Sequence, residues 1–324
     1  TGQRRVGKSY ILRDFLERHK EDMQTNFIYI NKERKKFDAI KNNEQLNAYI
    51  DEHWVEGLHN FILIDEVQEI ESWEKSVRSY RTEEDTDIII TGSNSKMLSS
   101  ELSTLIGGRY HEIYVQSLSY QEFLLFHELE DNDDALSKYI NYGGLPGLKQ
   151  VGLDDEEFVW DYIRAVFHTV MLKDIVERNN IRNVSFLNTL LRYFADTIGK
   201  LSSLNNISKF MKSQGLDVSV KSIAAYLNYF RDAYLLLTVD RFDIHGKKLL
   251  ESNEKIYFGD VGLRNLIAGG ERQGDIEKIL ENIVYQQLVR MGYAVSVGQL
   301  RAGEVDFVCT KSNERLYVQV AYLI

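Results

Sequence analysis

The sequence contains almost no cysteine or proline, and each scarcity excludes classes of protein. Its 324 residues include one cysteine, Cys309, and one proline, Pro146. A single thiol cannot form an internal disulfide or a cysteine-cluster metal site, so we expect a reducing, cytoplasmic location. With one proline, 21 glycines and 44% hydrophobic residues, the composition excludes collagen-like and low-complexity chains and predicts large buried cores.

Long apolar runs and an excess of positive charge are also absent. No run approaches the roughly 20 apolar residues that a membrane-spanning helix needs, so we expect no membrane association. The chain has 39 basic and 49 acidic residues and a net charge of −10, which argues against a protein that coats nucleic acid over its whole surface. Residues 183–250 differ, because nine Lys or Arg against five Asp give this segment a local excess of positive charge.

The first 126 residues alternate short apolar runs with amphipathic segments. This pattern is typical of a parallel sheet with helices on both faces, so an α/β fold is expected here. The expected helices are 8–20, 43–52 and 73–80, and the expected strands are 26–31, 61–64 and 87–91.

The strongest motif lies at the start of the chain, where residues 2–9 read GQRRVGKS and match G-x-x-x-x-G-K-[ST]. In such a P-loop, backbone N–H groups surround the β-phosphate, Lys8 reaches the β and γ oxygens, and the Ser9 hydroxyl binds Mg²⁺. The motif therefore predicts binding of ATP with Mg²⁺. The predicted nucleotide-binding residues are Gly2, Gln3, Arg4, Arg5, Val6, Gly7, Lys8 and Ser9.

A second acidic motif completes the predicted site. Residues 61–66 read FILIDE, a buried strand whose carboxyl end carries Asp65 and Glu66. We expect Asp65 to hold Mg²⁺ through water and Glu66 to polarise the attacking water. The predicted reaction is hydrolysis of ATP.

The third strand leads into residues 92–95 (GSNS), where Ser93 and Asn94 are candidates for sensing the γ-phosphate or positioning the lytic water. The alternative is a loop in which these side chains bond to their own backbone. Arg109 is a candidate for stabilising the phosphoryl transition state, in cis or in a neighbouring subunit. Its alternative is an ordinary surface arginine, so an oligomer is left open.

Four segments are predicted along the chain. Residues 1–126 form the P-loop ATPase core, 127–182 a helical lid or connector, 183–250 a winged-helix-like segment and 251–324 a small α/β end. Because Thr1 stands where a strand normally leads into a P-loop, we expect a fragment that lacks this strand. The end at Ile324 similarly predicts truncation.

The winged-helix-like segment and the α/β end are predicted from the order of their expected helices and strands. Three helices at 183–199, 203–213 and 219–232, then a strand at 234–242 and a basic hairpin at 245–248, follow the order of a winged helix. The end is expected to contain a helix at 281–291 and strands at 293–297, 304–309 and 315–321. The acidic run 154–157 predicts the start of a helix, and GGLPG at 143–147 a turn or hinge.

With these motifs, the sequence resembles prokaryotic ATP-binding proteins that join an AAA-type ATPase core to a C-terminal domain of unknown function. The resemblance spans essentially the whole chain, and the ATPase motifs are its most specific part. It implies an ATPase core, a helical lid, a winged-helix segment and an end similar to PD-(D/E)XK nucleases. The matching segments are TGQRRVGKS, FILIDEVQ, IIITGSNS, GGR with SLSYQEFL, YGGLPG, LKDIVERNNIRN, KIYFGDVGLRN and ENIVYQQL with GEVDFV and YVQVA.

In nucleases of that kind, carboxylates hold Mg²⁺ and a lysine polarises water. The matching positions here are Glu281, Glu304, Asp306 and Gln319, whereas Ala321 stands where the lysine belongs. The resemblance therefore implies a structural remnant without nuclease activity. Lys311, between the last two strands, is the candidate for a displaced lysine.

The winged-helix segment has two interpretations. Lys221, Asn228 and Arg231 on its third helix, with Lys247 and Lys248 on the hairpin, could contact DNA phosphates. Alternatively, the segment packs against a partner protein. The two function hypotheses follow: an ATPase whose turnover drives the C-terminal half, or a slow nucleotide-controlled switch that reports to DNA or a protein.

Overall fold

The computed structural model describes residues 1–95, 110–244, 248–270, 273–300 and 303–322, except for the side chains of 248–253 and 273. The chain forms two compact units, Thr1–Val115 and Gln116–Ile324. The first unit ends before the predicted boundary at residue 126, and the segments predicted beyond that boundary all lie in the second unit. Among the described helices, none is both long and apolar enough to cross a membrane.

The first unit contains a parallel three-stranded sheet in the order β1 (Thr25–Asn31), β2 (His59–Asp65) and β3 (Thr86–Ile90). The strands are mostly apolar because helices cover the sheet on both faces. In the parallel register Asn31 lies beside Asp65, and β3 ends beside Ile64. The carboxyl ends of all three strands therefore share one edge.

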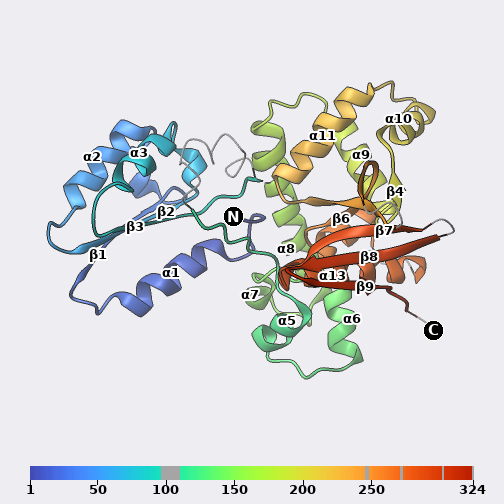
Figure 1. Ribbon diagram of the computed structural model, residues 1–324, viewed down its shortest axis with the longest axis horizontal. Helices are drawn as coiled ribbons and strands as arrows, with labels where there is room; N and C mark the ends of the chain where they lie inside the picture. Colours follow the sequence, from blue (N-terminus) through green and yellow to red (C-terminus); the bar gives the residue numbers. More distant parts are fainter. Residues whose placement is uncertain (96–109, 245–247, 271–272, 301–302, 323–324) are drawn as a thin grey trace. The chain divides into compact units, whose positions relative to one another are not determined.

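Helices lie on both faces of this sheet (Figure 1). The helices α2 (Asn43–His53) and α3 (Trp73–Tyr80) pack on one face, together with the short helices η1 (Lys35–Phe37) and η2 (Val67–Glu69). On the other face, Phe15 of α1 (Lys8–His19) contacts the rings of Phe27 and Phe61. The predicted α/β fold is confirmed.

The second unit begins with five helices, three of which start at a side-chain cap. The Asp155 carboxylate accepts bonds from the N–H groups of Glu157 and Phe158, so the helix start predicted in the acidic run is confirmed. Ser119 and Glu122 form a capping box in the same way. The helices are α5 (Tyr120–His127), α6 (Asp133–Tyr142), α7 (Leu148–Val151), α8 (Glu156–Thr169) and the π-helix η4 (Val170–Glu177).

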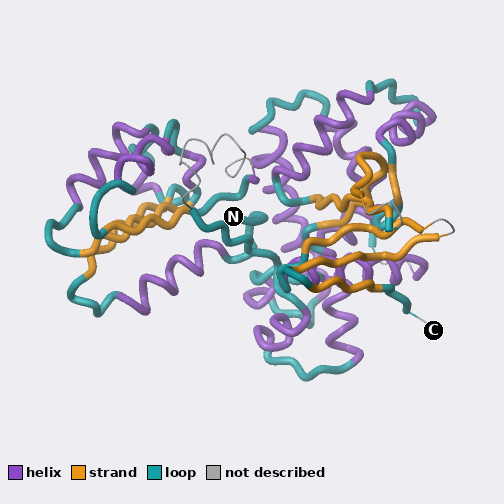
Figure 2. Tube along the Cα trace, in the orientation of Figure 1, coloured by secondary structure: helices purple, strands orange, loops and turns teal. Residues whose placement is uncertain are grey.

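The rest of the second unit is built on one six-stranded sheet, in the order β4-β6-β5-β7-β8-β9 (Figure 2). Its neighbouring strands are antiparallel except for β5 and β7, which are parallel. The strands are β4 (Leu201–Ser202), β5 (Leu236–Asp243), β6 (Lys248–Phe258), β7 (Ala294–Leu300), β8 (Gly303–Lys311) and β9 (Glu314–Val318). The helices are α9 (Val184–Asp196), α10 (Leu204–Ser213), α11 (Val220–Asp232), α12 (Val261–Ala268), η5 (Gln273–Asp275) and α13 (Ile276–Arg290).

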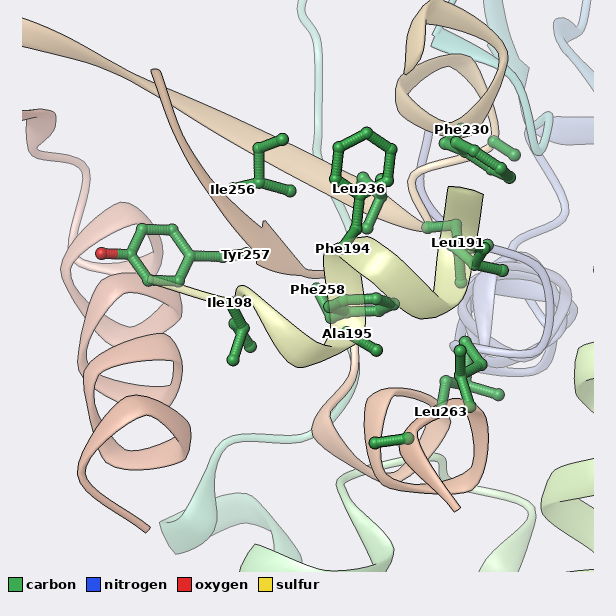
Figure 3. Close-up of a cluster of buried hydrophobic side chains, with 14 of the residues drawn as sticks. Leu191, Phe194, Ala195, Ile198, Phe230, Leu236, Ile256, Tyr257, Phe258 and Leu263 are labelled. Atoms are coloured by element: carbon green, nitrogen blue, oxygen red, sulfur yellow. The ribbon is translucent and has the colours of Figure 1, made fainter. Parts of the chain in front are cut away.

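This sheet crosses the boundary predicted at residue 250. The strand β6 runs through it, and its second half and α12 are elements that the sequence analysis did not predict. A large apolar core joins the sheet to the helices, with Phe194, Phe230, Leu236, Ile256 and Phe258 at its centre (Figure 3). The chain's one thiol, Cys309, is buried.

The run GGLPG forms a buried turn near the start of the second unit. The Gly144 N–H donates to Asp260 Oδ2 at 2.9 Å, and the Leu118 N–H donates to the Gly144 carbonyl at 2.7 Å. A Cβ on Gly144 would lie 2.2 Å from the Leu118 carbonyl oxygen, so only glycine fits. Three segments with which the sequence resembles its family, SLSYQEFL, YGGLPG and KIYFGDVGLRN, therefore meet at one polar cluster.

Candidate functional site

The P-loop leads directly into α1 and wraps around the side chain of Lys8. Gly2 and Gly7 have φ values of 145° and 102°, and a Cβ on Gly2 would lie 2.1 Å from the Val115 carbonyl oxygen. The buried Lys8 ammonium donates to the carbonyl oxygens of Gly2 at 2.9 Å and Gln3 at 2.8 Å. The lysine is thus held inside the loop that precedes it.

Asp65, at the carboxyl end of β2, is fully buried and held from both neighbouring strands. Its Oδ1 accepts a bond from Thr91 Oγ1 at 2.6 Å, and its Oδ2 accepts bonds from Asn31 Nδ2 at 2.9 Å and the Tyr29 hydroxyl at 3.4 Å. The donors are uncharged, so they fix the carboxylate without neutralising it. The sequence analysis missed Asn31 and Thr91, although both stand at the ends of expected strands.

Glu66 follows in a left-handed conformation with φ of 57°, an uncommon one for a residue with a side chain. Its N–H donates to Thr91 Oγ1 at 3.2 Å, so one threonine positions both acidic residues. Its Oε2 accepts bonds from Ser93 Oγ at 3.3 Å and from Gln68 Nε2. The predicted water-activating carboxylate is therefore tied to the loop that follows β3.

Arg4 links the P-loop to the acidic residues Glu33 and Glu66, which follow β1 and β2. Its guanidinium is buried and lies 3.3 Å from Glu33 Oε1 and 4.0 Å from Glu66 Oε2. The structure thus brings together the P-loop, the end of β2 and Ser93, as the sequence predicts. Glu33 and Gln68 were not predicted.

The other predicted residues are placed as follows. Asn94 is buried on the segment after β3, Val6 is buried, Ser9 is half-buried in the first turn of α1, and Arg5 is exposed. Arg109 lies outside the described residues, so its proposed role stays a prediction.

The carboxylates predicted in the C-terminal segment also come together. Glu281 of α13 and Glu304 and Asp306 of β8 surround the ammonium of Lys255, a residue of β6 that the sequence analysis did not consider. Gln319 donates to Asp306, whereas Ala321 is exposed beyond the end of β9. Lys311 lies apart from this cluster, because its ammonium donates to the Met291 carbonyl at 2.7 Å.

The basic face predicted on 219–232 is present on α11. Lys221, Asn228 and Arg231 are exposed, while Ile223 and Leu227 are buried. Lys247 and the side chain of Lys248 lie outside the described residues.

Comparison with known proteins places these observations in a family. A family model described as an AAA domain matches residues 1–124, and a domain of unknown function (DUF8612) matches residues 133–273. An uncharacterized protein of Haemophilus influenzae is 36% identical over 332 residues, which cover 100% of this chain and 82% of that protein. The chain belongs to the family of this protein, and its residues 1–124 carry the AAA domain. An uncharacterized protein of Methanocaldococcus jannaschii is 30% identical over 340 residues, covering 99% of this chain and 73% of that protein.

A solved structure shows the same fold. A Walker-type ATPase of Pyrococcus abyssi has a TM-score of 0.57 at 15% identity, covering 82% of this chain and 89% of that one. The predicted P-loop ATPase fold is therefore confirmed.

Proposed function

We propose that this protein binds ATP with Mg²⁺ and hydrolyses it. The observation that carries the proposal is the meeting of the P-loop with the end of β2, where Arg4 lies 4.0 Å from Glu66 and Asp65 is held in place by Thr91 and Asn31. A phosphate-binding loop beside a fixed carboxylate pair is the arrangement that phosphoryl transfer requires.

The side chains present fit this ligand. The Lys8 ammonium lies within a loop whose N–H groups can face a phosphate, and Arg4 adds a second buried cation. Ser9 and Asp65 supply the hydroxyl and carboxylate oxygens that Mg²⁺ prefers, Asp65 through water. When bound, Mg²⁺ supplies positive charge against the phosphate oxygens.

Glu66 is the residue that we assign to activation of the attacking water. Ser93, Gln68 and Arg4 are all placed against Oε2, so Oε1 is the oxygen that we assign to the water. Ser93 positions Glu66, and the buried Asn94 beside it is assigned to the γ-phosphate. The Thr91 hydroxyl donates to the Asp65 carboxylate and accepts from the backbone N–H of Glu66.

Calorimetric titration of ATP tests the binding half of this proposal. Lys8→Ala is expected to abolish ATP binding, because the loop then loses the ammonium that reaches the phosphates. Lys20→Ala is the matched control, since Lys20 lies just beyond α1 and pairs only with the exposed Glu17 at 2.5 Å in the described structure. Wild-type affinity in Lys8→Ala would contradict the proposal.

We further propose that α9 to β6 form a winged helix that binds DNA and couples this binding to ATP turnover. Three helices, the short strand β4 and the β5–β6 hairpin follow in winged-helix order, and β4 pairs with β6 beside β5. Exposed Lys221, Asn228 and Arg231 lie along α11, where phosphate contacts would form.

Salt-dependent binding to duplex DNA tests this second function. Replacing Lys221 and Arg231 with glutamate is expected to weaken binding and to reduce the salt slope by about two, one for each lost phosphate contact. Replacing Arg18 and Lys20 with glutamate changes the net charge equally and serves as the control. If the wild type does not bind DNA at low salt, the DNA proposal is wrong and the surface is one for a protein partner.

A further inference from the structure

Three carboxylates of the second unit converge on a single ammonium group. The Lys255 Nζ lies 2.7 Å from Glu281 Oε1, 2.6 Å from Glu304 Oε1 and 3.6 Å from Asp306 Oδ1. These residues come from β6, α13 and β8, and β5 and β7 stand between β6 and β8 in the sheet. The cluster and the proposed nucleotide site have no residue in common.

The Lys255 ammonium is buried, and other groups donate hydrogen bonds to the carboxylates around it. The Lys255 side chain is 3% exposed, whereas Glu304 is 32% exposed and forms the outer side of the cluster. Tyr257 turns its hydroxyl away from the apolar core (Figure 3) and donates to Glu281 Oε1. Gln319 Nε2 and the Val320 N–H donate to Asp306 Oδ2 at 2.6 and 2.9 Å.

The electrostatics agree with a permanently charged lysine. Burial alone lowers the pKa of Lys255, but Glu281 and Glu304 outweigh it, and the pKa lies above its ordinary value. Burial raises the pKa of Glu281 and the Asp306 carboxylate adds to this effect, whereas the Lys255 ammonium acts in the opposite direction. In the described part of the chain, the ion pairs of Glu281, Glu304 and Asp306 are all made with the Lys255 ammonium.

A divalent metal ion and this lysine require the same space. Mg²⁺ and Mn²⁺ bind carboxylate oxygens at roughly 2.0–2.2 Å, inside the ring of oxygens to which Lys255 now donates. Among the described residues, no group of three or more His, Cys, Asp or Glu is arranged to hold a metal ion. The carboxylates are therefore spaced around an ammonium group.

We propose that Lys255 is the resident cation of a carboxylate cluster that would otherwise bind a divalent metal ion. The lysine supplies in the protein the charge that a metal ion would bring, and it joins α13 to β6 and β8. Replacing it with an uncharged side chain uncovers a latent divalent-cation site formed by Glu281, Glu304 and Asp306.

Titration with Mn²⁺ in the absence of nucleotide tests this proposal on the full chain. The wild type is expected to bind no Mn²⁺ at the cluster and to keep its melting temperature in millimolar Mn²⁺. Lys255→Met is expected to take up one Mn²⁺ per chain and to melt at a higher temperature when Mn²⁺ is added. Adding Asp306→Asn to Lys255→Met should abolish this uptake, which separates the cluster from the P-loop. Lys311→Met, outside the cluster, should behave as the wild type.

Three outcomes would overturn the proposal. One is a wild-type Mn²⁺ site that Asp306→Asn removes, and a second is a folded Lys255→Met that takes up no Mn²⁺. The third is Mn²⁺-dependent cleavage of plasmid DNA by the wild type that both Lys255→Met and Asp306→Asn abolish, because Lys255 would then be a displaced nuclease lysine. If Lys255→Met does not fold without metal, the proposal predicts that millimolar Mn²⁺ restores its fold and that adding Asp306→Asn prevents this rescue. Absence of rescue would also overturn the proposal.

Discussion

The two acidic sites of this protein treat their carboxylates in opposite ways. At the end of β2, Asp65 is held by the uncharged donors Thr91 and Asn31, which fix its position without offsetting its charge. In the second unit, Glu281 and Asp306 surround Lys255, which offsets their charge from within the protein. Both sets of carboxylates are largely buried, so the charge of their partners is what distinguishes the proposed ligand site from the structural cluster.

The largest effect expected from this comparison is on stability. Lys255→Met leaves three carboxylates without their cation, and breaking such a buried pair costs about 3–5 kcal/mol of unfolding free energy. Thermal or urea unfolding without metal measures it. Lys311→Met removes an exposed lysine of the same sheet and should cost far less. Equal stabilities of the two variants would show that the cluster does not hold the second unit together.

The next largest effect tests the role of the uncharged groups that donate hydrogen bonds to Asp65. Thr91→Val keeps the shape of the side chain but removes the donor to Asp65 Oδ1 and the acceptor for the Glu66 N–H. Leaving these buried groups unpaired costs about 1–3 kcal/mol. We expect ATP turnover to fall by about 10- to 100-fold, as for other residues that orient a metal ligand.

Steady-state turnover and ATP titration together check this prediction. ATP affinity should change much less than turnover, because the P-loop is intact. Thr82→Val is the control, since the Thr82 hydroxyl is exposed and donates only to the Ser79 carbonyl. Wild-type turnover in Thr91→Val would show that Asp65 and Glu66 hold their positions without it.

The smallest effect concerns His127 of α5, whose buried Nε2 is bonded neither to an uncharged group nor to a charged one among the described residues. Its Nε2 is buried with no hydrogen-bond partner in the described part of the chain, and burial, with the charge of Lys149, lowers its pKa to about 4. The folded state therefore favours the neutral ring. Its contribution to stability is present above the ordinary pKa of 6.5 and is lost as the pH falls toward 4.

Melting temperatures between pH 7 and pH 4 test this sign. His127→Leu should lose less stability than the wild type over this range, whereas the exposed His168→Leu should follow the wild type. A steeper loss in His127→Leu would mean that the ring gains a proton on folding.

Much of the nucleotide site could be predicted from the sequence because its chemistry lies in short, contiguous motifs. The P-loop, Asp65 and Glu66 follow from local patterns and from the rule that parallel strands end at one edge. The partners of Asp65 depend on register: Asn31 ends one strand and Thr91 follows another, and only the pairing of β1, β2 and β3 makes them neighbours.

The second site could be predicted only in part. Its carboxylates follow from a family resemblance, but Lys255 lies on a half-strand with three apolar residues after it and no clear alternation, so no strand was expected there. The last strand was expected to reach residue 321 and ends at Val318, because the Val320 N–H donates to the Asp306 side chain rather than to a neighbouring strand. Hydrogen bonds and ion pairs between the side chains of distant segments leave no pattern in the local sequence.

ATP turnover by Glu66→Gln, measured with its ATP affinity, tests the central claim most directly. The substitution keeps the size of the side chain but removes its negative charge and its ability to accept a proton. We predict that ATP binds with an affinity within about twofold of the wild type and that turnover falls by about 10²- to 10⁴-fold. Unchanged turnover would contradict the assignment of Glu66 to water activation, and an equal loss of binding would show that it serves the structure of the site instead.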